Sequence, residues 1–313
     1  MEFYHQPVLL DEVIEGLNIQ ADGDLVDGTV GGGGHSYYIL KNSSPKGKLM
    51  GIDRDNDALV AAKKRLQEFG ERVTFVHDNF KNIKKIFYMN DWHKVHGALI
   101  DLGVSSFQID SGLRGFSYMQ NGPLDMRMNT QDITTAKDLV NNASKEELTN
   151  IIKKYGEERW AVRIAEFIVK HRVEKEIETT HELVSIIEKA IPKKAREANS
   201  HPAKRTFQGL RIATNKEIEG LSEAISDFVD ILHPGGRLAV ISFHSLEDRI
   251  VKNIFRDLAL ECVCPPKLPV CTCDKEAKVK IITKKSITAS EKELKGNSRA
   301  KSARLRIVEK LTG

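Results

Sequence analysis

Short apolar runs alternate with a helical pattern along the first hundred residues of the chain. The runs cover residues 25–29, 49–52, 73–77 and 98–101, and each has the length and composition of a buried strand. Between the second and third runs, apolar residues recur at helical spacing over residues 58–69. Short apolar strands separated by helices predict a parallel sheet built from strand–helix–strand units.

A helical pattern replaces this alternation in the middle of the chain. After a stretch rich in glycine and serine, residues 135–191 show helical periodicity throughout. Two capping-box pairs predict helix starts within this segment, Ser144 with Glu147 and Thr179 with Glu182.

Strand and helix signals return further along the chain. They predict a helix over residues 218–232 that stops at the sequence HPGG, a strand over 238–243, a helix opened by Ser245 with Asp248, and strands over 279–282 and 304–308. Residues 102–237, 136 in all, separate the fourth strand from the fifth, where a crossover unit usually needs about 30. We therefore expect residues 1–108 and 210–313 to form one α/β domain, and residues 109–209 to form a helical domain inserted between the fourth and fifth strands.

Composition limits the class of protein. A chain of 313 residues with 40% hydrophobic and 29% charged residues is typical of a globular protein. No apolar run approaches the roughly 20 residues that a membrane span needs, and the first residues, MEFYHQPVLLDEV, do not resemble a signal peptide. These features predict a cytoplasmic protein with reduced thiols and no association with a membrane.

Positive charge is concentrated near the C-terminus. The whole chain has a formal net charge of +4, whereas residues 275–313 contain twelve Lys or Arg against four Asp or Glu, a local net of +8. Such a segment is typical either of a solvated surface or of an enzyme that acts on a polyanion, and charge alone leaves both open.

The segment most indicative of chemistry is DLVDGTVGGGGHS at residues 24–36. Asp27 ends the first strand run, and four consecutive glycines follow it. Each glycine costs about 0.5–1 kcal/mol relative to alanine inside a regular element, so the run favours a turn where backbone passes close to a bound molecule.

Acidic residues follow three of the predicted strands, namely Asp27, Asp53 and Asp101. Ligands of open parallel sheets bind at the carboxyl ends of the strands, and Asp53 lies 22 residues after Gly31, a spacing typical of a carboxylate that binds ribose hydroxyls. The alternative is that these residues only form turns and helix caps.

Two ligand classes fit a glycine loop with a ribose-binding acid. A dinucleotide motif started from Gly31 requires glycine at position 36, where this chain has Ser36. The negative charge of Asp27 beside the loop is also unfavourable for a pyrophosphate. The pattern therefore favours S-adenosylmethionine, whose end is positively charged, over a nicotinamide cofactor.

Eight motifs in order resemble those of the bacterial MraW family, methyltransferases that act on N4 of cytosine in 16S ribosomal RNA. They are HQPVLLDEV (5–13), VDGTVGGGGHS (26–36), IDRD (52–55), DLGVSSFQID (101–110), GPLDMRM (122–128), HPAKRTFQGLRI (201–212), ISFHSLEDRIVK (241–252) and NSRAKSARLR (297–306). The resemblance covers nearly the whole chain. It implies a Rossmann-like class I methyltransferase sheet with the inserted helical domain. It also implies S-adenosylmethionine-dependent methylation of a decoding-centre cytosine, within the small ribosomal subunit, by a monomer or homodimer.

The resemblance also implies a cofactor site. Gly33, Gly34 and His35 would line the methionine end, Asp53 would bind the ribose and Phe80 would pack against adenine. Asp101 and Gln108 would complete the wall of the pocket. An aromatic face suits a nucleobase, so the chemistry of Phe80 agrees with this assignment.

The exocyclic amine of cytosine is a weak nucleophile, and an enzyme can assist it by holding it in line and accepting its hydrogens. Many amino-methyltransferases have a D/N/S-P-P-Y/F segment after the fourth strand, where this chain has DLGVS. We expect Asp101 to be the hydrogen acceptor, with Ser105 assisting and His244 orienting the base. The alternative is that Asp101 contacts only the cofactor.

A basic and aromatic cluster near the end of the insertion is the candidate RNA-binding surface. Its members are His201, Lys204, Arg205, Phe207 and Arg211. The basic groups would contact phosphates and Phe207 would stack on a base, with residues 299–306 as a further phosphate clamp. The alternative is a solvated helix face with Phe207 in the core.

All four cysteines lie within twelve residues, as Cys262, Cys264, Cys271 and Cys273. Two C-x-C pairs can surround one tetrahedral zinc ion, and a surface loop of reduced thiols is the alternative. At the level of function, a nicotinamide-dependent oxidoreductase and a non-catalytic RNA-binding ribosome-assembly factor remain the competing hypotheses.

Overall fold

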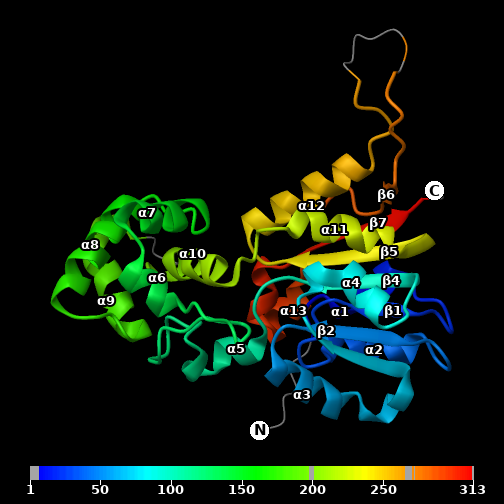
Figure 1. The fold of residues 1–313 in the computed structure, drawn as a ribbon, viewed down its shortest axis with the longest axis horizontal. Coiled ribbons are helices and arrows are strands. Elements are labelled where there is room, and N and C mark those ends of the chain that lie inside the picture. The colour runs from blue at the N-terminus through cyan, green and yellow to red at the C-terminus, as the bar shows by residue number, and fades with distance from the viewer. Residues whose placement is uncertain (1–6, 197–200, 265–269, 271, 312–313) are drawn as a thin grey trace. The chain divides into compact units, whose positions relative to one another are not determined.

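The computed structural model describes residues 7–196, 201–264, 270 and 272–311. The chain forms two compact units, one made of Met1–Gly103 with Gly220–Gly313 and the other of Val104–Glu219. The second unit is drawn mainly in green in Figure 1. The boundary expected between residues 209 and 210 would cut helix α10 (Lys204–Asn215), whose residues Phe207 and Leu210 are buried in the core of the second unit.

A seven-stranded sheet forms the centre of the first unit, with the strand order β3-β2-β1-β4-β5-β7-β6. The strands are β1 (Leu25–Asp27), β2 (Leu49–Asp53), β3 (Val73–His77), β4 (Val95–Asp101), β5 (Leu232–Ser242), β6 (Val279–Ile281) and β7 (Arg304–Lys310). The pairs among β1 to β5 are parallel, and β7 runs antiparallel to both β5 and β6. This arrangement confirms the predicted Rossmann-like sheet. Its strand order reverses between β1 and β4, where ligands of such sheets usually bind.

Strand β5 begins earlier than the sequence pattern predicts. The HPGG sequence was expected to end a helix, yet it lies inside β5. Val95 pairs with Leu232 and Gly97 with Arg237, so β5 advances five residues while β4 advances two. The extra residues form a bulge, and Gly235 has the positive φ of 77° that a glycine tolerates.

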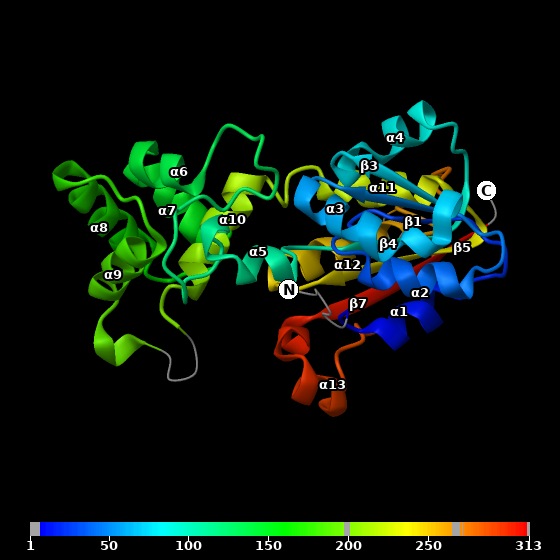
Figure 2. The same ribbon diagram turned by 90° about the horizontal axis from the view of Figure 1, so that it is seen from below.

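Helices cover both faces of this sheet. The helices of the first unit are α1 (Leu10–Leu17), α2 (Gly34–Asn42), α3 (Asn56–Arg65), α4 (Ile83–Met89), α11 (Leu221–Asp230), α12 (Ser245–Leu258) and α13 (Glu291–Gly296). One core contains buried residues of α4, α11 and α12, and another contains those of α1 and α2. Figure 2 shows α1 and α2 on one side of the sheet and α4 and α11 on the other.

The second unit is helical, as predicted for residues 135–191. Its helices are α5 (Ser106–Asp110), α6 (Ala136–Asn142), α7 (Lys145–Lys154), α8 (Ala161–Glu174), α9 (Thr180–Ala190) and α10. Both predicted capping boxes are present, at Ser144 with Glu147 and at Thr179 with Glu182. The chain also contains the 3₁₀ helices η1 (Gln67–Arg72), η2 (Phe80–Asn82), η3 (Gly112–Arg114), η4 (Lys193–Ala195) and η5 (Ser298–Ser302).

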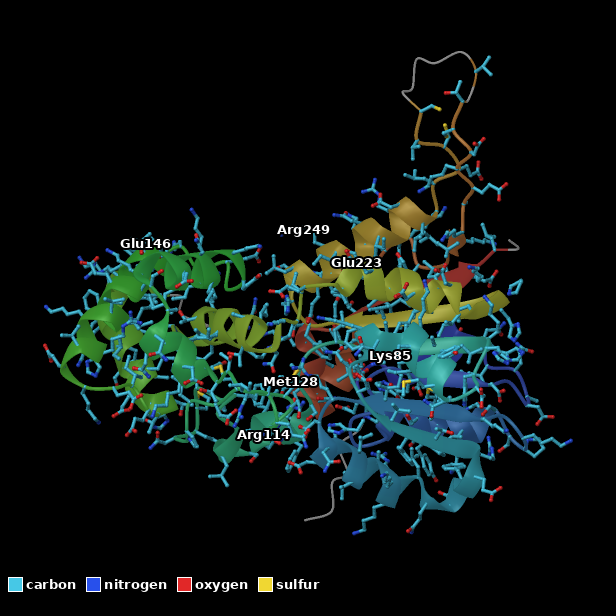
Figure 3. The ribbon with its side chains drawn as sticks, in the orientation of Figure 1. Lys85, Arg114, Met128, Glu146, Glu223 and Arg249 are labelled. Carbon is cyan, nitrogen blue, oxygen red and sulfur yellow. The ribbon has the colours of Figure 1, made fainter. Side chains whose placement is uncertain are left out.

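The GPLDMRM motif is held inside the second unit by buried polar side chains. The amide of Asn215 donates to the carbonyl of Met126 at 2.7 Å and accepts from the N–H of Met128 at 2.8 Å. Arg114 donates to the carbonyl of Met128 at 2.8 Å, and Figure 3 labels both residues. These contacts give the motif a structural role in fixing an irregular segment. Nowhere in the described part of the chain is a helix both long and apolar enough to cross a membrane.

Candidate functional site

Asp27 is buried where β1 ends, with 1% of its surface exposed. Its carboxylate accepts a 2.6 Å hydrogen bond from the Ser36 hydroxyl and a 3.1 Å bond from the backbone N–H of Thr29. Burial nevertheless raises the pKa of Asp27 to about 6, because removal from water disfavours the charged form. A cationic group nearby would stabilise its ionised state.

The glycine loop connects β1 to α2, and the physical reason for having glycine differs from one position to the next. Gly31 and Gly33 have positive φ values of 51° and 75°. A Cβ added at Gly34 would lie 2.7 Å from Cγ of Pro7, so packing alone requires glycine there. A Cβ added at Gly32 would meet nothing within 4 Å. Packing or backbone conformation therefore accounts for three of the glycines, and the backbone at Gly32 faces open space.

Asp53 ends β2 and is fixed by two backbone groups. Its Oδ2 accepts a 2.8 Å hydrogen bond from the N–H of Gly31, and its Oδ1 accepts a 2.9 Å bond from the N–H of Asp55. Burial raises the pKa of Asp53 to about 6. A carboxylate has about four acceptor sites, so capacity remains for hydroxyl donors.

Asp101 ends β4 and faces His35. One carboxylate oxygen, Oδ2, lies 3.8 Å from Nδ1 of His35. The other, Oδ1, is buried and has no hydrogen-bond partner among the residues that the structure describes. Burial raises the pKa of Asp101 well above its usual value, and the charges of Asp27 and Glu247 raise it further. The side chain as a whole is 26% exposed, so its carboxylate is within reach of a ligand donor.

His35 is neutral at physiological pH, because burial lowers its pKa to about 4. Its Nε2 lies 2.9 Å from the carbonyl oxygen of Val8, and only a protonated Nε2 can donate to a carbonyl. Nδ1 therefore presents its lone pair towards Asp101. The His35 ring is therefore held inside the protein at the edge of the site.

Thr29 links two of the acidic strand ends, and no pattern in the sequence indicates this role. Its hydroxyl oxygen accepts a 2.7 Å hydrogen bond from the backbone N–H of Asp101, 72 residues away. Ser36 likewise supports Asp27, whereas its sequence position indicated only that the dinucleotide motif is broken. These two hydroxyls position the carboxylates that the sequence did identify.

Phe80 follows β3 at the start of η2 and is partly exposed. Its ring centroid lies 6.3 Å from that of Phe228. A Cβ added at Gly28 would lie 2.9 Å from Cζ of Phe228 and 3.2 Å from Cβ of Phe80, so Gly28 allows these rings to pack beside the end of β1.

His244 caps helix α12, where the sequence predicted Ser245 with Asp248. Nδ1 of His244 accepts a 3.3 Å hydrogen bond from the N–H of Glu247. Its Nε2 lies 3.0 Å from Oε1 of Glu247, without the geometry of a hydrogen bond. Asp248 instead forms a 2.7 Å ion pair with Arg306. The expectation that Asp248 caps the helix is therefore wrong.

Ser105 and Gln108 belong to the second unit, where they cap α5. The Ser105 hydroxyl accepts from the N–H of Gln108 at 3.2 Å, and Oε1 of Gln108 accepts from the N–H of Ser105 at 3.0 Å. This reciprocal capping box is a local structural role for both residues.

The candidate RNA-binding residues of α10 and its approach differ in exposure. Lys204 is exposed, and the His201 ring stacks on Tyr118 with centroids 4.7 Å apart. Arg205 lines a cavity of about 30 Å³ in the second unit, as does His201. These three residues lie near one another at the start of α10.

Two members of that cluster have other roles in the structure. Phe207 is 3% exposed and belongs to the core of the second unit, so it is not a free surface for stacking on a base. Arg211 forms a bidentate pair with Glu217, at 2.9 Å for both hydrogen bonds. In the phosphate clamp expected at residues 299–306, Arg306 is not available to phosphate, because it is 9% exposed and paired with Asp248.

Three of the four cysteines gather in the loop between α12 and β6. The Sγ atoms of Cys262, Cys264 and Cys273 all lie within 4.8 Å of one another. Cys271, the fourth candidate ligand, lies outside the described residues.

Comparison with known proteins gives consistent matches over the whole chain. The model of the MraW methylase family matches residues 2–311. The ribosomal RNA small subunit methyltransferase H of Clostridioides difficile (strain 630) is 55% identical over 311 residues, which cover 99% of this chain and 100% of that protein. The proteins of the same name from Finegoldia magna and Heliobacterium mobile are 54% and 51% identical over 312 residues, with the same coverage of both chains.

Proposed function

Because the chain belongs to the MraW methylase family, we propose that it transfers a methyl group from S-adenosylmethionine to N4 of a decoding-centre cytosine in 16S ribosomal RNA. The observation that carries this proposal is the set of three carboxyl groups around the glycine loop. That of Asp27 is buried, and those of Asp53 and Asp101 are partly exposed. Removal from water raises the pKa of each of these groups, which disfavours the ionised form. A cationic ligand would stabilise the ionised form.

These residues fit S-adenosylmethionine. Bound there, it supplies a methyl group attached to a positively charged sulfur, and its amino group adds a second positive charge. The carboxyl groups of Asp27 and Asp101 suit that charge, whereas a pyrophosphate would be repelled. The unhindered backbone at Gly32 allows close approach of a ligand, and the partly exposed carboxylate of Asp101 offers an acceptor.

The other cofactor contacts are assigned on chemical grounds. Asp53 would accept from the ribose hydroxyls, since both its oxygens are already oriented by backbone N–H groups. The partly exposed ring of Phe80 would pack against adenine. Gly33, Gly34 and His35 would border the methionine end, and Gln108 remains a proposed cofactor contact.

Asp101 is our candidate for holding the amine. In this proposal the partly exposed carboxylate of Asp101 accepts a hydrogen of N4. This directs the nitrogen lone pair towards the methyl group, and the carboxylate receives the proton after transfer. Positive charge from a bound sulfonium lowers the pKa of Asp101, so the carboxyl becomes a better acceptor when the donor is present. Ser105 and His244 are proposed to assist in orienting the base.

RNA contacts are proposed for the second unit. The exposed Lys204, together with Arg205 and His201, would bind phosphates near a base turned out of its stack. Small ribosomal subunits in the cytoplasm are the proposed setting. Phe207 and Arg211 are not among the proposed direct contacts, because Phe207 lies in the core and Arg211 pairs with Glu217.

Methyl transfer to purified small subunits tests the proposal. The wild-type protein with methyl-labelled S-adenosylmethionine should produce N4-methylcytidine, identified by mass spectrometry of digested RNA. Asp101→Asn should lower the single-turnover rate by about 100-fold or more, with binding of S-adenosylhomocysteine within a few-fold. Asp257→Asn, a change at an exposed position of α12, should leave the rate unchanged.

The competing hypotheses predict other outcomes. A non-catalytic assembly factor would bind subunits without transferring methyl groups. A nicotinamide-dependent oxidoreductase would bind NAD rather than S-adenosylmethionine. A methylated nucleoside other than N4-methylcytidine would contradict the assigned position while retaining the methyltransferase activity.

A further inference from the structure

The loop between α12 and β6 extends away from the rest of the first unit (Figure 1, orange). Its base is closed by a 2.8 Å hydrogen bond from the N–H of Lys278 to the carbonyl of Leu258. Over residues 260–264, 270 and 272–278, the described residues include no helix, no strand and no buried side chain. Val263 and Val270 are 59% and 71% exposed. Hydrophobic packing therefore does not order this part of the loop, and short segments without a core usually need a cross-link.

Three thiols converge in this loop at distances that suit a metal ion. Sγ of Cys262 and Sγ of Cys273 are 3.6 Å apart, and Sγ of Cys264 lies within 4.8 Å of both. None of the three is in a disulfide bond, which would need a sulfur–sulfur distance of about 2.05 Å. Zinc–sulfur bonds of about 2.3 Å in a tetrahedron place sulfur atoms roughly 3.8 Å apart. The observed spacing is close to this value.

Backbone amides also donate to each of these sulfur atoms. The N–H of Cys264 donates to Sγ of Cys262 at 3.3 Å, and the N–H of Thr272 donates to Sγ of Cys264 at 3.4 Å. The N–H of Val263 donates to Sγ of Cys273 at 3.4 Å. Hydrogen bonds of this kind stabilise thiolates, the form in which cysteine binds metals, and they fix the direction of each ligand.

We propose that Cys262, Cys264 and Cys273 bind one zinc ion, which orders the loop between α12 and β6. Thiolate ligands select soft or borderline metals, and zinc needs no redox partner. Cys271 completes the second C-x-C pair in the sequence but lies outside the described residues, so the site rests on the other three.

The position of this site makes it structural. It follows the C-terminal end of α12, whose fourteen residues span about 21 Å from the cap at His244. The zinc is therefore remote from the glycine loop and takes no part in methyl transfer. Its occupancy can be tested independently of the proposed function.

Metal analysis of the full-length protein, purified with a tag that does not bind metals and without chelators, tests the proposal. Wild-type protein should contain about one zinc ion per chain, and a thiol-blocking mercurial should release it. Cys262→Ser with Cys273→Ser should reduce the zinc content at least tenfold. Val263→Ser is the matched control, because it introduces the same residue in the same loop at an exposed side chain and keeps every thiol.

Two further measurements separate a metal site from other roles of the thiols. Cobalt(II) added to the zinc-free protein should give thiolate-to-metal charge-transfer absorption that the double variant lacks. Trypsin should cut the loop near Lys275 faster after zinc is removed, while the circular dichroism of the protein stays unchanged. Zinc content below about a tenth of an ion per chain after incubation with zinc, equal content in the double variant, or an intact mass showing a disulfide in reducing buffer would each overturn the proposal.

Discussion

The backbone N–H of Gly31 donates a 2.8 Å hydrogen bond to the Asp53 carboxylate, so the glycine loop and the end of β2 fix each other. Asp53 has a second anchor in the N–H of Asp55. A ligand that binds at this edge of the sheet therefore meets an acceptor already held in one orientation, and little side-chain entropy is lost when the ligand forms its own bonds.

Asp53→Asn should weaken binding of S-adenosylhomocysteine by at least tenfold. An asparagine side chain has only one acceptor oxygen, so it cannot accept from Gly31 and Asp55 through two oxygens and also receive both ribose hydroxyls. Isothermal titration calorimetry measures the effect. Asp57→Asn, the same substitution on an exposed residue in the first turn of α3, should bind like the wild type. Equal affinities of all three proteins would remove Asp53 from the cofactor site.

Binding of S-adenosylmethionine near pH 6.5 should release protons. The pKa values of Asp27 and Asp53 are about 6 and that of Asp101 is raised well above its usual value, so part of these groups is protonated before binding. A cation lowers all three pKa values, and the affinity should therefore rise as the pH increases from 5 to 7. Calorimetry in buffers of different ionisation enthalpy counts the protons. S-adenosylhomocysteine, which lacks the sulfonium charge, should release fewer, and equal release by both ligands would contradict this account.

The buried carboxyl of Asp27 should also make stability depend on pH. Its pKa is about 6 in the folded protein and close to the ordinary value of 3.8 when unfolded, so its contribution is fully present below about pH 4 and is lost as the pH rises through 6. A shift of about two units corresponds to roughly 3 kcal/mol in the free energy of unfolding. Asp27→Asn, which has no charge to bury, should be more stable than the wild type at pH 7.5 and nearly equal to it at pH 4.5.

Urea denaturation followed by circular dichroism at the two pH values checks this sign. The exposed Asp257→Asn is the control, and its unfolding midpoint should follow that of the wild type at both pH values. A lower midpoint for Asp27→Asn at pH 7.5 would mean that the hydrogen bonds from Ser36 and Thr29 outweigh the cost of burying the charge.

The sequence predicted the framework of the site because that framework depends on local patterns. The ends of apolar runs located Asp27, Asp53 and Asp101, and the order of the runs predicted a parallel sheet. The family motifs implied the Rossmann-like methyltransferase sheet, which is confirmed. Contacts between distant residues left no such pattern. The bond from the N–H of Asp101 to Thr29 joins residues 72 apart.

The other predictions that failed concerned the roles of individual residues on helices. Phe207 and Arg211 are four residues apart on α10, which is compatible with one functional face. In the structure, the first is in the core and the second pairs with Glu217 on the following turn. A residue type that suits RNA binding also suits burial or ion pairing, and only the tertiary structure separates these roles. The capping of α12 by His244 was missed for a similar reason, since histidine is not among the preferred N-cap residues.

Asn215→Ala should destabilise the second unit by about 3 kcal/mol, because it leaves buried polar groups of the GPLDMRM motif without partners. Asn215 is 4% exposed, donates to the carbonyls of Met126 and Arg211, and accepts from the N–H of Met128. Each unsatisfied group costs about 1–3 kcal/mol, and the gain in helix propensity from alanine offsets less than 1 kcal/mol.

The matched control is Asn150→Ala, at an exposed position of α7, which should change stability by less than about 0.5 kcal/mol. Amide hydrogen exchange followed by mass spectrometry measures both, with the N–H of Met128 losing protection in the first variant only. Unchanged protection there would show that this segment is held by Arg114 rather than by Asn215.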